Sequence, residues 1–133
     1  MTSVRFEIFV DDMEAAQAFY THLFGWTFQA DESNADLQSV NYHYAQGPKT
    51  IPKGVVIGMM TRPDYSPTPG GPARGGVMTF HVDDTDNAYT WALENGGGEA
   101  LPPTNYPGVG RLAYIEDGHG NIVGLLTPTP KEK

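Results

Sequence analysis

Proton-transfer chemistry has its best candidates in Glu7 and His81, which lie in two similar apolar segments. Glu7 belongs to VRFEIFV, residues 4–10, and His81 belongs to GVMTFHV, residues 76–82. A histidine titrates near neutral pH, and a carboxylate beside it would orient its ring as an acid or a base. Glu7 and His81 are therefore the candidate catalytic pair, on the condition that the fold brings the two segments together.

The other three histidines offer weaker chemistry. His22 lies beside the apolar stripe of a predicted helix, which favours the surface. His119 lies in the sequence GHGN, where glycines and an asparagine favour a tight hairpin, so it is predicted to be a turn residue at the surface. No two histidines have an i, i+4 spacing with a carboxylate, and the chain has no cysteine. The sequence therefore predicts no metal site.

The elements that must position these residues occur twice. VDDMEAAQAFYTHLFG, from residue 10, returns as VDDTDNAYTWALENGG from residue 82. Each copy predicts a helix that begins at an aspartate and ends near a glycine, preceded by one alternating strand. Three strand-like segments follow each helix: WTFQA, SVNYHYA and GVVIGMM in the first copy, and GEALPP, RLAYIE and NIVGLL in the second. The pattern predicts an α+β fold of two tandem β-α-β-β-β modules, neither of which buries its sheet alone.

Module 1 is predicted to span about residues 3–60 and module 2 about residues 77–128, with a C-terminal tail at 129–133. Between the modules, residues 61–76 contain prolines and glycines that exclude both a helix and a central strand. We interpret this segment as a linker. The alternative is a lid that closes on a ligand, in which case Arg62, Tyr65 and Arg74 would matter.

Composition narrows the class of partner. The 133 residues fit a single domain, and 39% hydrophobic residues with 11% aromatic residues are typical of a globular protein. A net charge of -8 without a cluster of Lys or Arg argues against nucleic acid and against acidic membrane surfaces. The sequence has no apolar run of membrane-spanning length and no signal peptide at its start, so a cytoplasmic location is expected.

Two quoted stretches carry a resemblance to a known family. VDDMEAAQAFYTHLFGW near the start and PGVGRLAYIEDGHGNIVGLLTP near the end resemble the vicinal oxygen chelate superfamily, the group of glyoxalases, bleomycin-resistance proteins and ring-cleaving dioxygenases. EDGHGN resembles the family's Asp-Pro-Asp-Gly-Asn turn, with Gly118 and His119 as departures. The resemblance implies curved four-stranded sheets, or half-barrels, around a shared cavity, with the helices outside. It also implies a homodimer, with modules paired within one chain or between chains.

The metal ligands of that family occupy four places, and this chain can be checked at each. Arg5 and Val77 stand at the first-strand positions, and Gly58 and Gly124 stand where a glutamate would lie on the last strands. None of these side chains suits a divalent cation, which takes imidazole nitrogens and carboxylate oxygens. The resemblance therefore points to the metal-free branch of the family, without a cofactor.

Alternation assigns the side chains that face the implied cavity. The predicted set, a mixture of apolar and polar side chains, is Arg5, Glu7, Phe9, Asn41, His43, Val56, Gly58, Met60, Val77, Thr79, His81, Leu112, Tyr114, Glu116, Gly124 and Leu126. The resemblance brings the first strands of the two modules together, so Arg5, Glu7, Thr79 and His81 would cluster. Two interpretations stay open: Glu7 and His81 transfer protons, or Arg5 and Glu7 form a salt bridge and His81 is hydrogen-bonded at a strand end.

Three functions follow from these predictions. The first is a protein that binds a small amphipathic organic molecule in the cavity between the modules without the family's metal. The second is a metal-independent lyase or isomerase that uses Glu7 and His81 for proton transfer; whether the protein is an enzyme stays open. The third is an accessory or regulatory domain that meets a protein partner, with Trp26 and the proline-rich linker as contacts.

Overall fold

The computed structural model describes residues 4–62, 68–71 and 77–130. The chain divides into two compact units, residues 1–67 and 68–133. Tyr65 and Arg74 of the possible lid lie outside the described residues. Arg62 forms an ion pair with Asp11 at 3.6 Å, and its Nη2 donates to the Phe9 carbonyl at 3.3 Å.

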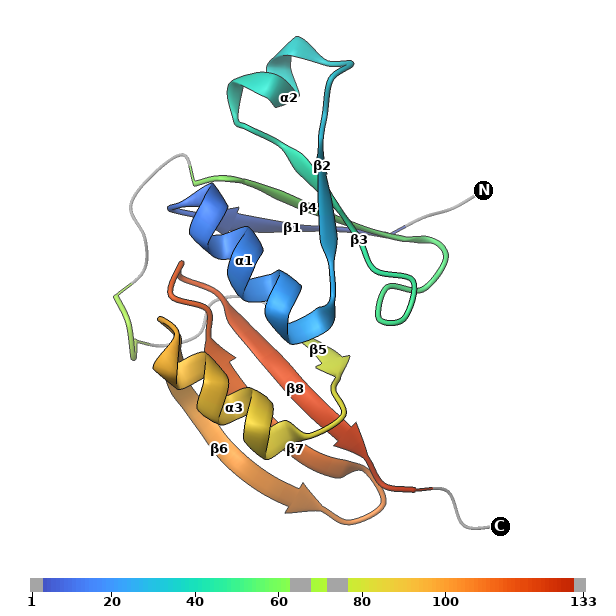
Figure 1. Ribbon diagram of the computed structural model, residues 1–133, viewed down its shortest axis with the longest axis vertical. Helices are drawn as coiled ribbons and strands as arrows, with labels where there is room; N and C mark the ends of the chain where they lie inside the picture. The colour runs from blue at the N-terminus through green and yellow to red at the C-terminus, as the bar shows by residue number, and fades with distance from the viewer. Residues whose placement is uncertain (1–3, 63–67, 72–76, 131–133) are drawn as a thin grey trace. The chain divides into compact units, whose positions relative to one another are not determined.

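The first unit is a four-stranded mixed sheet with one long helix and one short helix (Figure 1). Its elements are β1 (Val4–Val10), α1 (Met13–Phe24), β2 (Thr27–Ala30), α2 (Ala35–Ser39), β3 (His43–Gln46) and β4 (Val55–Thr61). The strand order is β1-β4-β3-β2, with β1 and β4 parallel and the other pairs antiparallel. The first and last strands of the unit are therefore neighbours.

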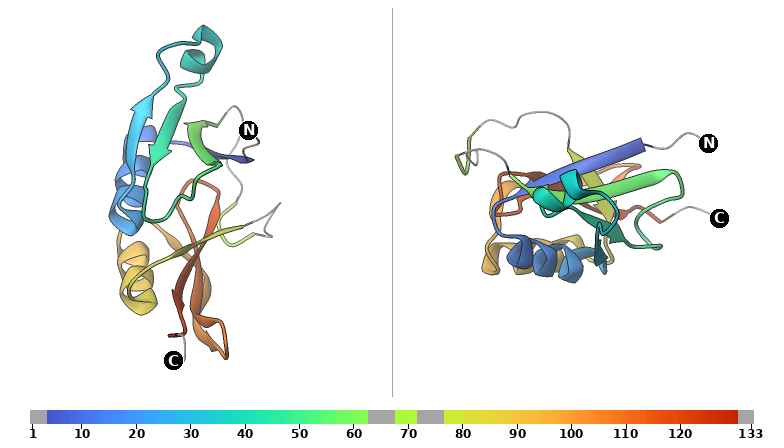
Figure 2. Two further views of the ribbon diagram at one scale, coloured as in Figure 1. Left: turned by 90° about the vertical axis from the view of Figure 1, so that its right-hand side faces the viewer. Right: turned by 90° about the horizontal axis from the view of Figure 1, so that it is seen from above.

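The second unit repeats this arrangement. Its elements are β5 (Met78–His81), α3 (Thr85–Glu94), β6 (Gly98–Tyr106), β7 (Gly110–Glu116) and β8 (Ile122–Pro128). The strand order is β5-β8-β7-β6, again with only the first pair parallel, and α3 packs on β6, β7 and β8 (Figure 2). The predicted α+β fold of tandem β-α-β-β-β modules is confirmed, and both sheets are open.

The repeated acidic sequence begins both long helices. Asp12 accepts a hydrogen bond from the Ala15 backbone N–H at 3.0 Å, and Asp84 accepts from that of Asn87 at 3.1 Å. These bonds satisfy N–H groups that the first helical turn leaves without partners. Gly25 ends α1 in the left-handed conformation, at a φ of 70°, as its sequence position predicts.

The second half of the first unit differs from the prediction. The predicted strand from Ser39 begins only at His43, because α2 and a turn occupy the preceding residues. The Asn34 side chain caps α2 by accepting from the backbone N–H groups of Asp36 and Leu37, and Asn41 takes a φ of 57° in the turn. Such local side-chain bonds compete with strand pairing.

The predicted short segment GEALPP is the start of a nine-residue strand, β6. Its prolines are tolerated because β6 lies at the sheet edge and its pairing with β7 is irregular around Leu101 and Thr104.

The core of the first unit is aromatic. Trp26 is fully buried, stacks on Tyr20 at a centroid distance of 5.4 Å and donates through Nε1 to the Thr50 hydroxyl at 2.7 Å. Phe24 lies 5.2 Å from the same indole. Trp26 is therefore a core residue, and the expectation that it contacts a protein partner is wrong.

Candidate functional site

The face of the first sheet opposite its buried core carries the predicted polar residues. Ile8, Val10, Ile57 and Met59 are buried on one side, and alternation places the intervening side chains on the other. The register sets Arg5 beside Val56, Glu7 beside Gly58 and Phe9 beside Met60. These six residues share one face, as alternation predicts; whether they bind a ligand stays a prediction.

Tyr42 joins Arg5 and Glu7 on this face. Its hydroxyl donates to Glu7 Oε2 at 2.7 Å and accepts from Arg5 Nη1 at 3.4 Å. Burial, and secondarily the bond to Glu7, raises the pKa of Tyr42 to about 12, so the phenol is neutral at physiological pH. The link from Arg5 to Glu7 thus runs through a phenol hydroxyl, which modifies the simple salt bridge weighed from the sequence.

Tyr44 extends the cluster toward Asp31. Its hydroxyl donates to Asp31 Oδ2 at 2.8 Å, and Asp31 Oδ1 accepts from the backbone N–H groups of Ser33 and Asn34. The bond from Tyr44, followed by that from Ser33, lowers the pKa of Asp31, while the carboxylate raises the pKa of Tyr44. Asp31 is thus an ionised anchor that fixes the Tyr44 ring.

The two tyrosine rings flank the Arg5 guanidinium. Its central carbon lies 5.9 Å from the Tyr42 ring centroid and 5.8 Å from that of Tyr44. The hydrogen bond with Tyr42, before any other cause, raises the pKa of Arg5. Arg5 and Glu7 are nevertheless both exposed, so a cation and an anion face solvent side by side.

Tyr42 occupies the space above Gly58. A Cβ placed on Gly58 would overlap the Tyr42 hydroxyl and the ring carbons next to it. Glycine is therefore required for Tyr42 to cross β4 and reach Glu7 on β1. The position at which the resemblance places a metal-binding glutamate is filled here by a tyrosine from a neighbouring segment.

The assignment of β3 side chains from the sequence is wrong. Alternation of apolar residues places Tyr42 and Tyr44 on the helix side, whereas the register pairs Tyr44 with Gly58 on the Glu7 face. His43 pairs with buried Met59 on the opposite face, where its Nδ1 lies 2.9 Å from the Asn41 carbonyl, and Asn41 lies exposed in the turn. Neither belongs with Glu7. The prediction failed because it treated tyrosine as an apolar residue, whereas a tyrosine has an apolar ring and a polar hydroxyl.

The second sheet gathers the predicted residues of module 2 on one face. Thr79 pairs with Gly124, which pairs with Tyr114, and His81 pairs with Leu126. Leu112 and Glu116 share this face by alternation, and Val77 precedes β5. A Cβ on Gly124 would overlap the Thr79 side chain. The second position expected for a glutamate is thus covered as well, by a different strand.

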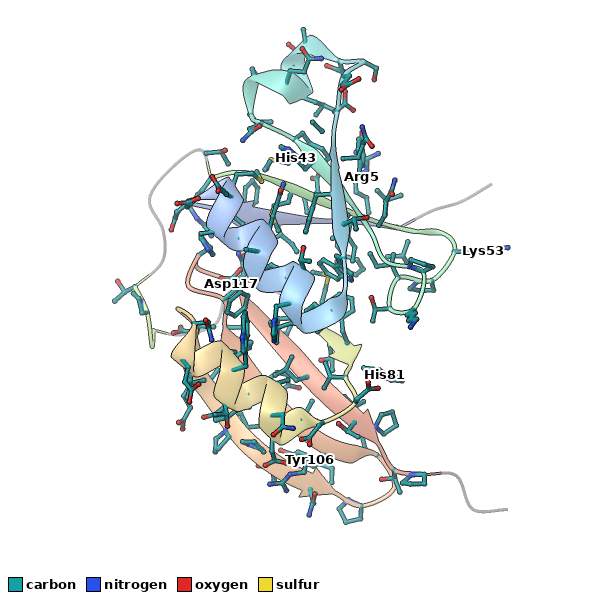
Figure 3. The ribbon with its side chains drawn as sticks, viewed as in Figure 1. Arg5, His43, Lys53, His81, Tyr106 and Asp117 are labelled. Carbon is teal, nitrogen blue, oxygen red and sulfur yellow. The ribbon has the colours of Figure 1, made fainter. Side chains whose placement is uncertain are left out.

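The proposed pair of Glu7 and His81 is divided between the two units (Figure 3 labels His81). Glu7 is hydrogen-bonded to Tyr42, and His81 is exposed at the end of β5. Their proximity, and the cavity shared by the modules, stay predictions.

His119 does not lie at the surface. It is in the predicted turn, but its exposed fraction is 8% and that of Asp117 is 1%. Asp117 Oδ1 accepts from the backbone N–H groups of His119 and Asn121 at 2.7 and 3.1 Å, and Oδ2 accepts from the Asn121 side chain at 2.9 Å. The Asp117 carboxylate therefore holds the backbone of the turn, a contact that turn propensity does not predict.

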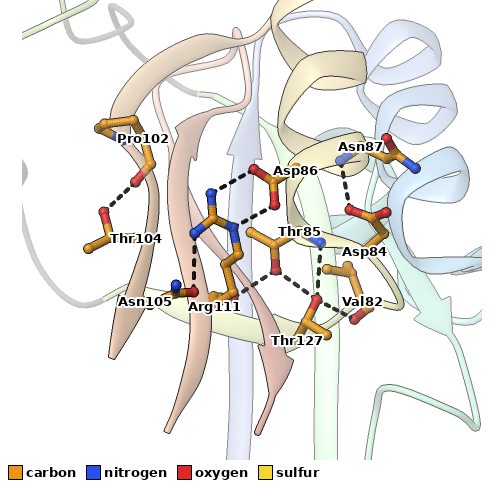
Figure 4. A network of polar contacts seen from close by, with 10 residues as sticks. All are labelled: Val82, Asp84, Thr85, Asp86, Asn87, Pro102, Thr104, Asn105, Arg111 and Thr127. Atoms are coloured by element: carbon orange, nitrogen blue, oxygen red, sulfur yellow. Dashed lines mark hydrogen bonds and ion pairs between the residues drawn. The ribbon is translucent and has the colours of Figure 1, made fainter. Parts of the chain in front are cut away.

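A further polar network in the second unit has a structural role (Figure 4). Arg111 binds both carboxylate oxygens of Asp86, with Nη2 to Oδ1 at 2.9 Å, and donates to Asn105 Oδ1 at 3.1 Å. Thr85, buried at the start of α3, donates to the Arg111 carbonyl at 2.7 Å and its N–H donates to Thr127 Oγ1 at 3.0 Å. These bonds attach α3 to β7 and β8.

One surface pocket lies away from both predicted sheet faces. A surface pocket of about 340 Å³ lies at the β6–β7 hairpin, between Tyr106, Arg111 and Pro128, and none of the predicted cavity residues lines it. Among the described residues, no three His, Cys, Asp or Glu side chains gather in a group that could hold a metal ion. No helix within residues 4–62, 68–71 and 77–130 is long and apolar enough to cross a membrane.

Comparison with known proteins supports the resemblance to the vicinal oxygen chelate superfamily. Residues 2–39 match the family described as bleomycin resistance protein-like N-terminal. A putative glyoxylase, CFP32, of Mycobacterium bovis is 31% identical over 127 residues, which are 95% of this chain and 44% of that protein. The chain thus spans less than half the length of the curated relatives it matches.

Solved structures agree on the fold. A glyoxalase/bleomycin resistance protein/dioxygenase family enzyme from Burkholderia phytofirmans superposes with a TM-score of 0.67 at 17% identity, over 97% of this chain and all of that one. TnmS3, an antibiotic binding protein from Streptomyces, superposes with a TM-score of 0.62 at 23% identity, over 97% of each chain. The architecture is that of the glyoxalase/bleomycin resistance/dioxygenase group, and these findings together support the resemblance of the chain to the vicinal oxygen chelate superfamily.

Proposed function

We propose that this protein binds a small amphipathic organic molecule on the sheet faces that carry Arg5 and Glu7 in one unit and Thr79 and Tyr114 in the other. The observation that carries the proposal is the make-up of these faces. Apolar side chains such as Val56 and Leu126 lie beside charged and hydroxyl groups on these faces, a combination that suits a molecule with one apolar part and one polar part. The likeness to an antibiotic binding protein supports the same class of function.

Binding without the superfamily's metal is part of the proposal. At Gly58 and Gly124, where the resemblance places glutamates, the space is taken by Tyr42 and Thr79. The remaining positions, Arg5 and Val77, offer no atom that coordinates a divalent cation. The residues present therefore do not fit the metal. The sequence also leads us to propose a homodimer and a cytoplasmic location.

The binding proposal is tested by titrating the ¹⁵N-labelled chain with a library of amphipathic compounds. We expect amide shifts for β1, β4, β7 and β8, and loss of binding in Met60→Asp, which places a charge among the apolar side chains of that face. The matched control is Leu93→Asp, at an exposed position of α3, which should bind as the wild type does. Shifts confined to α1 and α3, or equal binding by both variants, would refute the proposal.

The metal-free part is tested separately. Titration with Zn²⁺, Mn²⁺, Fe²⁺ and Ni²⁺ should give no stoichiometric binding, and compounds from the library should bind equally well after treatment with a chelator. A stoichiometric ion with amide shifts on β1 and β4 would overturn this part. Dimerisation is read from light scattering, where a monomer mass would contradict it.

A further inference from the structure

Arg5 and Glu7 present opposite charges that are held apart. They lie two residues apart on β1, both are exposed, and each bonds the same hydroxyl of Tyr42. The guanidinium has several N–H donors and the carboxylate has several lone pairs, so one hydrogen bond to Tyr42 leaves most of this capacity open to solvent.

The spacing of the two charges is fixed by buried groups. Tyr42 is 1% exposed and lies over Gly58, so its hydroxyl has one stable position between Arg5 and Glu7. On the other side, Asp31 holds Tyr44, whose ring lies against the guanidinium. Side chains that are held before a ligand arrives lose less conformational entropy on binding.

The surroundings restrict the charge of a ligand. An anion beside Arg5 also meets the carboxylate of Glu7, and a cation beside Glu7 also meets the guanidinium of Arg5. A ligand that carries both charges a few bonds apart satisfies both groups. Next to them, Val56 and Met60 of β4 supply an apolar surface on the same face, and Phe9 of β1 lies beside them with the Arg62 guanidinium 5.8 Å from the centroid of its ring.

We infer that this face binds amino-acid-like molecules: an α-amino carboxylate joined to an apolar or aromatic body. The carboxylate pairs with Arg5, the ammonium group with Glu7, and the body lies over Val56, Phe9 and Met60. Tyr42 and Asp31 are positioning residues that keep the charges apart. This inference rests on the proposed function, because it assigns a ligand class to the same face.

Four probes with one common body test the inference: phenylalanine, 3-phenylpropionate, 2-phenylethylamine and 3-phenylpropanol. In titrations of the ¹⁵N-labelled full chain, phenylalanine should bind about fivefold more tightly than either singly charged probe, the size typical of exposed charge pairs. Arg5→Gln should remove the advantage over 2-phenylethylamine, and Glu7→Gln should remove the advantage over 3-phenylpropionate.

Exposed charges outside the strands of this face supply the control variants, Lys49→Gln and Glu99→Gln, which should leave the ranking of the probes unchanged. Equal affinity for all four probes, with shifts on β1 and β4, would overturn the inference and leave amphipathic binding standing. The inference also fails alone if no probe shifts this face while a library compound does. If neither the probes nor the library compounds cause amide shifts, the inference and the proposed function are both overturned.

Discussion

The two units share a backbone plan and differ in almost every side chain that would meet a ligand. Both have the same strand order and the same aspartate cap. The face opposite the core nevertheless holds an Arg5–Tyr42–Glu7 cluster in the first unit, whereas the second unit has Tyr114 among Leu112, Leu126, Thr79 and Glu116. The repeat therefore preserves what the backbone requires and leaves the faces free to diverge.

The cores differ in the same way. The first unit packs Tyr20 and Phe24 against Trp26, whereas the second buries an aromatic ring, Phe80, with aliphatic side chains: Ala113, Ile115, Val123 and Leu125. Gly58 and Gly124 show the same contrast, because a buried tyrosine covers one and an exposed threonine covers the other. Equivalent positions of the two units thus have different side chains around them. The same substitution made in both units therefore measures how much each environment contributes to stability.

The largest difference is expected between the two tryptophans, one in each unit. Trp26→Ala removes a fully buried indole and its hydrogen bond, and should cost about 4 kcal/mol of unfolding free energy. Trp91→Ala removes a half-buried ring and should cost about half as much. Urea unfolding followed by circular dichroism measures the loss of unfolding free energy in each variant. The fluorescence of the remaining tryptophan reports on the unaltered unit. Equal losses would break the contrast between the cores.

The two buried glycines come next. Gly58→Ala should cost about 3 kcal/mol, because Tyr42 must leave its buried position, and Gly124→Ala about 1 kcal/mol, because Thr79 lies exposed on edge strand β5. In a Tyr42→Ala background, Gly58→Ala should become nearly neutral, which a double-mutant cycle detects. An unchanged cost in that background would show that Tyr42 is not what requires the glycine.

The hydroxyl of Tyr42 gives a smaller effect that depends on pH. Tyr42→Phe should cost about 1 kcal/mol at neutral pH. The pKa of Tyr42 is about 12 in the folded protein, above its unfolded value of about 10, so its contribution is complete below pH 10 and is lost as the pH rises through 12. The variant should therefore lose less stability between these values. Tyrosinate absorbance and unfolding midpoints measure this, with Tyr106→Phe as the exposed control; parallel pH curves would contradict it.

The smallest effects concern two aspartates whose partners differ. The pKa of Asp31 is lowered mainly by Tyr44 and that of Asp86 by Arg111. Each carboxylate therefore stabilises the fold above about pH 4, and this contribution is lost as the pH falls through the lowered pKa. Asp31→Asn should be the more harmful change and insensitive to salt. Asp86→Asn, at an exposed ion pair, should matter only at low ionic strength. Unfolding midpoints of the two variants in low and high salt test this prediction. A salt-dependent loss for Asp31→Asn together with a salt-independent loss for Asp86→Asn would contradict it.

By itself, the sequence determined the repeat, both long helices with their caps, and the faces of β1, β4, β5, β7 and β8. These features depend on side-chain periodicity and on bonds to residues a few positions away, which a sequence contains directly. The resemblance then pointed to the superfamily, and Gly58 and Gly124 stand at the positions where that resemblance places glutamates.

Only the tertiary structure decided the rest of the candidate site. Tyr42 and Tyr44 lie on the Glu7 face because pairing with β4 sets the register of β3, and a turn at Asn41 separates that strand from α2. The burial of His119 and the bond from Tyr44 to Asp31 likewise depend on residues that meet only in the folded chain. Because a tyrosine has an apolar ring and a polar hydroxyl, it can lie on the core face or on the opposite face of a sheet. Its contacts in the folded chain, and not the adjacent residues in the sequence, determine which face it occupies.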